Sequence, residues 1–402
     1  MKTLFKIFTI GLFLSLSIYL QASDVQVKKI TGENDLPENI CSKWQKGDYL
    51  ISDGKTLTII GASSRHLGLS NGNYATDNAM GSLISFVPAG QNLVCDMAIG
   101  SPDIRIKENR KYVYYTAITP STKKSPGEDL VFVATGRYTG DNGEKLDIET
   151  SYTFSPDAGE IAVTSRIRNA GVVEINDLDY SLYFGAYHSY SFSPYHKEDH
   201  PELNFRVYPK KGYSLGRLDL NPPKEDDEPN PGKLNPGEEH TIRHSLFVDK
   251  SGEKLLDTIY QNLHQNTELA TFQFDNFNGS TFEIIVRDPL TSSVFYRSFH
   301  KRMPTLQIPL PKGLYQVQAH FFPAVVEKLF RFGSGGENVC VLESTAIGTV
   351  WVKITDKKGE YVPGKVSFIG LDPTRTPYFL PENPVENGKR WETAKNSKFP
   401  PK

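Results

Sequence analysis

Two neighbouring segments, residues 145–154 and 160–168, carry the pattern that most constrains how this chain can fold. In the second segment Ile161, Val163 and Ile167 alternate with polar residues. A period of two puts one set of side chains in a core and the other in water, as in a half-buried β-strand. The residues between the segments, Ser-Pro-Asp-Ala-Gly, have the composition of a turn. We therefore expect two strands joined by a turn.

The polar positions of these two segments belong to the wet face of the expected strands. Asp147 and Glu149 stand in the first segment, and Arg166 and Arg168 stand in the second. Opposite charges on neighbouring strands commonly pair, so we expect the two acids to pair with one or other arginine. Exposed pairs of this kind contribute under about 1 kcal/mol each, which makes an ordinary structural role sufficient to explain them.

Similar segments recur along most of the chain. Glycine (32 residues), proline (26), tyrosine (20) and phenylalanine (23) are plentiful, and this combination favours β-strands joined by turns. An Asp-Gly dipeptide between two apolar runs predicts a hairpin over residues 47–61. Further strands are expected at 112–117, 130–135, 182–187 and 241–248, and then from about Leu269 onward at 282–287, 293–299, 305–310 and 315–320.

One segment, residues 251–264, predicts an α-helix. Ser251 is a good N-cap residue, and Glu253 places a negative charge in the first turn, where it favours a helix. The apolar residues recur at helical spacing and define one buried face; they are Leu255, Leu256, Ile259, Tyr260 and Leu263.

The N-terminus has the features of a secretory signal peptide. Lys2 and Lys6 precede an apolar run from Ile7 to Leu20, and small residues follow at Ala22 and Ser23. The run is shorter than the roughly 20 apolar residues of a comfortable membrane span. An uncleaved anchor is the alternative. The sequence therefore predicts a secreted or periplasmic protein that has no membrane segment beyond the signal peptide.

Charge and cysteine content exclude several functional classes. Lys and Arg number 45 against 47 Asp and Glu, so we expect no nucleic-acid surface. Three cysteines are too few for a disulfide scaffold. Two arrangements remain open: a Cys41–Cys95 bridge that leaves Cys340 as a free or buried thiol, or three buried cysteines that act as small hydrophobic residues.

A cluster of aromatic, histidine and acidic residues lies between positions 187 and 200. Tyrosine rings stack on the apolar faces of sugars, and histidine and carboxylate groups bond to hydroxyls. Histidines and acids can also ligate zinc, but the spacing does not match a recognised metal motif, so we assign no metal ligands. A surface loop that is merely rich in polar groups is the other alternative. We predict a ligand-binding loop formed by Tyr187, His188, Tyr190, Tyr195, His196, Asp199 and His200.

Two further histidines, His240 and His244, flank a strand-like run. On a strand, residues four apart share a face but lie about 13 Å from each other. That distance is too great for one metal ion, so we exclude this pair as a ligand set.

Several short motifs occur in an order found in one family. They are Gly47–Ile51 with Arg65–Gly68, Asp77–Gly81, Leu234–Glu238, Leu310–Val317, and Gly348–Val350 with Gly364–Phe368. Together they resemble the non-catalytic front half of CehA/McbA-type metallohydrolases over most of residues 45–380. The Leu310–Val317 motif is similar to the closing strand of carboxypeptidase-regulatory-like or prealbumin-like modules.

The resemblance implies β modules that precede a PHP-type catalytic domain, which holds a metal cluster in His/Asp-rich motifs. This sequence contains no such motifs, and its last module lacks a closing strand. We therefore expect a truncated relative or one part of a split gene, with no catalytic residues and no cofactor of its own.

Taken together, the sequence predicts a mainly β, multi-domain chain. A signal peptide (1–22) and a linker (23–43) precede a larger β-sandwich (44–265) with a long loop (188–239) and a closing helix (251–264). An immunoglobulin- or prealbumin-like small sandwich (266–345) follows, and then a partial carboxypeptidase-regulatory-like module with a polar tail (346–402).

The predicted function is binding. Its candidate partners are a glycan or small-molecule ligand and a separate hydrolase domain. The alternative is a sugar-active or metal-dependent hydrolase that acts through the loop at 187–200.

Overall fold

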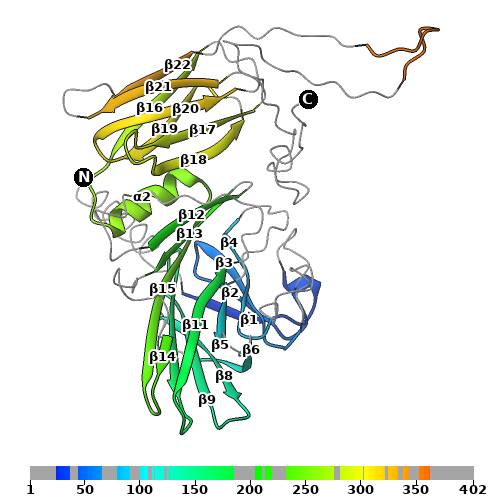
Figure 1. Ribbon diagram of the computed structural model, residues 1–402, viewed down its shortest axis with the longest axis vertical. Coiled ribbons are helices and arrows are strands. Elements are labelled where there is room, and N and C mark those ends of the chain that lie inside the picture. The colour runs from blue at the N-terminus through cyan, green and yellow to red at the C-terminus, as the bar shows by residue number, and fades with distance from the viewer. Residues whose placement is uncertain are drawn as a thin grey trace, which may run out of the picture. The chain divides into compact units, whose positions relative to one another are not determined.

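The structure of this chain, a computed structural model, is mainly β. Its residues group into two compact units (Figure 1). The first unit draws on 1–186, 201–204 and 215–250, and the second on 187–200, 205–214 and 251–402. The described residues are 24–36, 44–65, 79–90, 100–106, 111–112, 114–121, 125, 127–184, 204–210, 213–219, 232–275, 281–301, 303–321, 325–333, 338–343 and 353–362.

The first unit contains a sheet with the strand order β1-β2-β3-β4-β5-β11-β14, in which β6 also pairs with β5. A short 3-10 helix, η1 (Glu33–Asp35), follows β1. The strands are β1 (Gln26–Lys29), β2 (Tyr49–Ser52), β3 (Thr56–Ile60), β4 (Leu83–Pro88), β5 (Gly100–Ile106), β6 (Lys111–Tyr112), β11 (Ile175–Phe184) and β14 (Gly232–Leu234).

A second sheet of the first unit has the strand order β13-β15-β10-β9-β8-β7. Its strands are β7 (Tyr115–Pro120), β8 (Leu130–Thr139), β9 (Lys145–Phe154), β10 (Glu160–Asn169), β13 (Tyr213–Asp219) and β15 (Glu239–Asp249). Beside β13 in the sheet lies β12 (Asn204–Lys210). Residues 205–214, which include most of β12 and the start of β13, group with the second unit.

Side chains from the two sheets of the first unit meet in a shared core. The ring of Tyr49 on β2 lies edge-on to Phe132 on β8, with centroids 5.1 Å apart. The hydroxyl of Tyr152 on β9 donates to the carbonyl oxygen of Gly81, 2.6 Å away. Alternate residues of β8, β9 and β10 are buried, so the period-two pattern that predicted these strands is confirmed. The first unit is a β-sandwich.

The segment expected to be a linker, 23–43, contains a strand. β1 pairs antiparallel with β2, from Gln26 opposite Ser52 to Lys29 opposite Tyr49. All four residues of β1 are exposed. This edge strand pairs with one neighbour and buries none of its side chains, so its sequence carries no apolar alternation to reveal it.

The long loop expected over 188–239 is also wrong in part, because β12, β13 and β14 lie within it. Proline, glycine and lysine interrupt these segments and obscure their alternation. The strand expected at 182–187 begins earlier, at Ile175. Asn176, Asp177 and Asp179 have low β-propensity, which hid the first half of β11.

The predicted helix is confirmed as α2 (Gly252–Asn262), and it groups with the second unit. The side chain of its N-cap, Ser251, accepts a hydrogen bond from the backbone N–H of Lys254 at 3.2 Å. The buried face contains Leu255, Leu256, Ile259 and Tyr260. The helix was expected to close the first domain or to bridge to the second, and its residues group with the second unit.

The second unit also contains a small sandwich. A three-stranded sheet has the order β19-β16-β22, and a four-stranded sheet has the order β18-β17-β20-β21. Phenylalanine rings fill the core, including Phe272, Phe274, Phe282, Phe321 and Phe330. The strands are β16 (Glu268–Asp275), β17 (Thr281–Arg287), β18 (Val294–Lys301), β19 (Thr305–Leu310), β20 (Gly313–His320), β21 (Val325–Phe332) and β22 (Val339–Glu343).

These sheets confirm the predicted multi-domain, mainly β fold. Most of the expected third module (346–402) lies outside the described residues, as do the expected signal peptide (1–22), Cys41 and Cys95. Cys340 is a buried free thiol. Within the part of the chain that the structure describes, no helix is both long and apolar enough to cross a membrane.

Candidate functional site

The loop predicted from sequence as a ligand site lies outside the described residues. This applies to all of its members: Tyr187, His188, Tyr190, Tyr195, His196, Asp199 and His200. A binding role for that loop stays a prediction. Among the described residues, no group of three or more His, Cys, Asp or Glu side chains is placed to hold a metal ion.

The clearest candidate site within the first unit is a hollow of about 510 Å³ on the outer face of the second sheet. Its strands β7, β8, β9, β10 and β15 supply the lining. Charged and hydroxyl side chains dominate that lining, which consists of Thr116, Thr135, Gly136, Arg137, Asp147, Ile148, Glu149, Arg166, Arg168 and Glu239.

Strand register arranges the charges of the hollow in rows. In one row Arg137, Asp147, Arg168 and Glu239 stand opposite one another on β8, β9, β10 and β15. The signs alternate along the whole row. Neighbouring strands lie about 4.8 Å apart, so each charged group has a group of opposite sign on the next strand.

The next row along the strands contains Thr135, Glu149, Arg166 and Thr241. Hydroxyl groups replace charges at its two ends. The hollow therefore offers cationic donors, anionic acceptors and hydroxyls on one regular surface.

The tightest contact in the hollow joins Arg137 to Asp147. The guanidinium donates from Nε to one carboxylate oxygen at 2.5 Å and from Nη2 to the other at 2.9 Å. This hydrogen bond is the main cause that lowers the pKa of Asp147, and it raises the pKa of Arg137. The predicted ion pair between Glu149 and Arg166 is confirmed, with a nitrogen–oxygen distance of 3.8 Å.

Sequence reasoning assigned Asp147 to Arg166 or Arg168, whereas its hydrogen-bonded partner is Arg137. The expected strand 130–135 ended two residues too early to include Arg137, because Gly136 breaks the apolar pattern. β8 continues to Thr139. The alternation of β9 and β10 was a sufficient signal for Asp147, Glu149, Arg166 and Arg168. Glu239 was missed, because it begins β15 two residues before the strand expected at 241–248.

A second polar cluster lies buried within the first unit, around His244 on β15. Nδ1 of His244 lies 2.6 Å from Oδ1 of Asp219, and the Nε of Arg217 donates to the same oxygen at 2.6 Å. The Tyr180 ring stacks on the imidazole with centroids 6.1 Å apart. The exposed fraction of the His244 side chain is 4%.

Burial lowers the pKa of His244, although the hydrogen bond to Asp219 opposes the shift. Burial alone would raise the pKa of Asp219, but the hydrogen bond from His244 and the charge of Arg217 outweigh it, and the pKa is lowered. A neutral imidazole that donates from Nδ1 has an acceptor at Nε2. That atom is buried and accepts no hydrogen bond from any described residue.

A string of hydroxyls extends this polar region through the core. The hydroxyl of Tyr115 lies 2.5 Å from that of Thr150, which lies 2.8 Å from Ser165. The hydroxyl of Tyr180 donates to Ser165 at 2.9 Å. Burial raises the pKa of Tyr180 to about 12, so this hydroxyl keeps its proton. All four side chains are buried, and their mutual bonds satisfy them.

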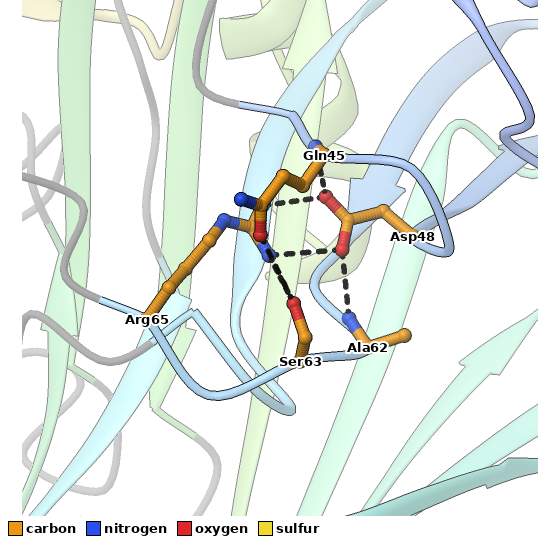
Figure 2. Close-up of polar contacts among 5 residues, drawn as sticks. All are labelled: Gln45, Asp48, Ala62, Ser63 and Arg65. Carbon is orange, nitrogen blue, oxygen red and sulfur yellow. Dashed lines mark hydrogen bonds and ion pairs between the residues drawn. The ribbon is translucent and has the colours of Figure 1, made fainter.

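Near the start of the first unit, a buried carboxylate fixes a loop (Figure 2). Asp48 accepts hydrogen bonds from the backbone N–H groups of Gln45 at 2.7 Å and Ala62 at 2.9 Å. Arg65 donates to both of its oxygens, at 3.0 and 2.5 Å. Every oxygen of Asp48 is occupied by the protein itself, so this cluster has a structural role.

The second unit has its own polar cluster at the start of α2. The hydroxyl of Tyr296 donates to Glu253 and lies 2.9 Å from Nε2 of His300. On β17 and β18, the buried Glu283 accepts a hydrogen bond from Arg297 at 2.6 Å. These contacts join α2 to β18 and β17 to β18.

Comparison with known proteins identifies no family. No protein-family model matches the chain, and no curated protein matches its sequence. Solved structures that match include a polysaccharide lyase, with 10% identity, a TM-score of 0.26, and coverage of 67% of this chain and 45% of the lyase.

Two further matches are α-galactosidases of glycoside hydrolase family 36 from Geobacillus stearothermophilus. AgaB has 13% identity, a TM-score of 0.26, and coverage of 58% of this chain and 44% of the enzyme. A variant of AgaA in complex with stachyose has 10% identity, a TM-score of 0.27, and coverage of 58% and 46%. This chain spans less than half the length of these proteins. At such low TM-scores the matches carry no argument about function.

Proposed function

We propose that the first unit is a glycan-binding β-sandwich and that the hollow on the outer face of β7, β8, β9, β10 and β15 is its binding site. One observation carries the proposal: a hollow of about 510 Å³ is lined mostly by charged and hydroxyl side chains. Its size falls within the range of about 300–1,000 Å³ that small-ligand sites occupy.

The chemistry of the lining selects the class of ligand. Most small-molecule sites are largely apolar, with a few polar groups. Here the proportion is reversed, so an apolar ligand would strip water from charged groups without replacing its hydrogen bonds. A polyhydroxylated ligand would donate to Glu149 and Glu239 and accept from the guanidinium groups. Hydrogen bonds to charged groups are the stronger class.

The strands that line the hollow also hold its charged side chains in fixed positions. All of its charged members stand on paired strands, and sites on regular elements are positioned more accurately than sites on loops. The register between β7 and β8 shifts near Tyr115, at one side of the hollow. Gly136 lies there too, and a Cβ at this position would come within 2.4 Å of the carbonyl oxygen of Tyr114.

Binding of purified full-length protein to a panel of neutral and acidic oligosaccharides, measured by calorimetry, tests this proposal. Glu149→Gln should weaken binding of any ligand found by roughly tenfold, which corresponds to about 1.4 kcal/mol. Glu160→Gln is the matched control, because Glu160 begins β10 on the same sheet but does not line the hollow. Equal weakening by both variants, or no binding to any oligosaccharide, would contradict the proposal.

We further propose that this recognition serves a metallohydrolase, as the order of the sequence motifs suggests. Support comes from the resemblance to the front half of CehA/McbA-type enzymes alone. The test is to sequence the coding region after codon 402 and the neighbouring genes, and to measure binding of this chain to any PHP-type domain encoded there. A neighbourhood without such a domain, or a purified domain that does not bind, would contradict it.

A further inference from the structure

We propose that the ligand of the hollow carries a carboxylate and that Arg166 and Arg168 bind it, which makes the ligand an acidic glycan built from uronic acids. The inference rests on the proposed function, and it adds the chemical class of the ligand. It follows from the contacts that the three arginines of the hollow, Arg137, Arg166 and Arg168, make with carboxylates of the protein.

One of the three arginines is already occupied by the protein. Arg137 directs two donors of its guanidinium to the two oxygens of Asp147, at 2.5 and 2.9 Å. This two-point contact is the geometry in which arginine binds carboxylates most strongly. The pair neutralises itself, so neither Arg137 nor Asp147 is the first choice for a ligand.

The other two arginines make no such contact. Arg168 stands opposite Asp147 on one neighbouring strand and Glu239 on the other. No carboxylate of the described residues lies within ion-pair distance of it. Arg166 reaches Glu149 only at 3.8 Å, without a hydrogen bond, and the exposed fractions of these two side chains are 58% and 50%.

An exposed ion pair of this kind is easy to replace. Such pairs contribute at most about 1 kcal/mol, so a ligand carboxylate that displaced Glu149 from Arg166 would lose little. Glu149 would then be available to accept hydrogen bonds from ligand hydroxyls.

The position of the two arginines suits one extended ligand. They are two residues apart on β10 and share its outer face, so their backbones are about 6.7 Å apart. A guanidinium is planar and offers paired donors that match a carboxylate, which an ammonium group does not. Cationic donors beside the acceptors Glu149 and Glu239 fit a ligand that carries both carboxylate and hydroxyl groups.

The experiment compares each acidic oligosaccharide with its own carboxyl-reduced form. The probes are oligosaccharides of galacturonic, glucuronic and mannuronic acid, with calorimetry on the full chain. The wild type should bind at least one acidic form roughly tenfold or more tighter than its reduced form. Added salt should narrow the difference, because it screens the charges.

Variants assign the preference to particular side chains. Arg166→Gln and Arg168→Gln should each remove most of the preference for the acidic form. Arg168→Lys should keep more of that preference than Arg168→Gln but less than the wild type. Arg243→Gln is the matched control: Arg243 is an exposed arginine on β15 outside the hollow, and its loss should leave the preference unchanged. Thermal unfolding of every variant checks that the fold is retained.

The outcomes separate the two proposals. Equal affinity for acidic and reduced forms, still weakened by Glu149→Gln, would overturn the carboxylate inference and leave glycan binding in place. A preference for acidic forms that survives both glutamine variants would also overturn it. Failure of the wild type to bind any neutral or acidic oligosaccharide would overturn the proposed function itself.

Discussion

Removing the carboxylate of Asp48 is expected to destabilise the first unit strongly. Its side chain is completely buried, and the exposed fraction of the Arg65 side chain is 14%. Asp48→Ala would leave the Arg65 guanidinium nearly buried without its counter-charge, and the backbone N–H groups of Gln45 and Ala62 without their acceptor. Asp48 thereby ties the segment that contains Gln45 to the segment that contains Ala62 and Arg65 (Figure 2).

The size of the effect follows from these contacts. Breaking a buried ion pair by removing one partner costs about 3–5 kcal/mol. A domain has a total free energy of unfolding of about 5–15 kcal/mol, so the variant would lose a large share of it. Asp48→Asn keeps one acceptor oxygen for a backbone N–H and should lose less than Asp48→Ala.

Urea unfolding followed by tryptophan fluorescence measures the loss. Trp44 packs against the cluster of Ile30, Ile59, Ala79 and Ile84 in the same unit, and so provides a local signal. Arg65→Met tests the cause, because the double variant with Asp48→Ala removes both charges. Its loss of stability should be smaller than the sum of the two single losses. A loss under about 1 kcal/mol for Asp48→Ala, or simple additivity, would refute this reasoning.

Two further predictions concern acid and packing. The lowered pKa of His244 means that the folded protein resists protonation of this side chain. The stability that neutral His244 contributes is therefore fully present above about pH 6.5 and is lost as the pH falls toward the lowered pKa. The urea midpoints of unfolding at pH 7 and pH 5 should differ less in His244→Asn than in the wild type, and an equal difference would contradict this. Gly61→Ala should lower the free energy of unfolding in urea by about 1–3 kcal/mol or more, because its Cβ would lie 2.0 Å from the carbonyl oxygen of Ala79. Gly32→Ala is the control: no atom lies within 4 Å of a Cβ at that position, and the loss should be less than half as large.

The sequence was most informative where one strand face is apolar and the other polar. The limits of β9 were predicted without error, and those of β10 within one residue, because their buried positions repeat every second residue. α2 was predicted from its cap and its apolar face. Edge strand β1 and the first half of β11 were missed, because exposed or acidic residues conceal the pattern there.

The candidate site was predictable only in part. Asp147, Glu149, Arg166 and Arg168 were assigned to one wet face, and they do line one hollow. Its volume depends on how five strands are placed side by side in one sheet, which no local pattern records. The pairing of His244 with Asp219 joins residues 25 positions apart, and Asp219 ends a strand that the sequence did not reveal.

The buried string of hydroxyls has a consequence for how the strands of the first unit find their partners. Apolar alternation forbids a slip of one residue between β9 and β10, because it would turn Arg166 inward. It permits a slip of two residues, which keeps every side chain on its proper face. Such a slip would part Thr150 from Ser165, which stand opposite each other. Each buried hydroxyl left unsatisfied costs about 1–3 kcal/mol. Several strand registers satisfy the apolar alternation equally well, and these hydroxyls favour the native one among them.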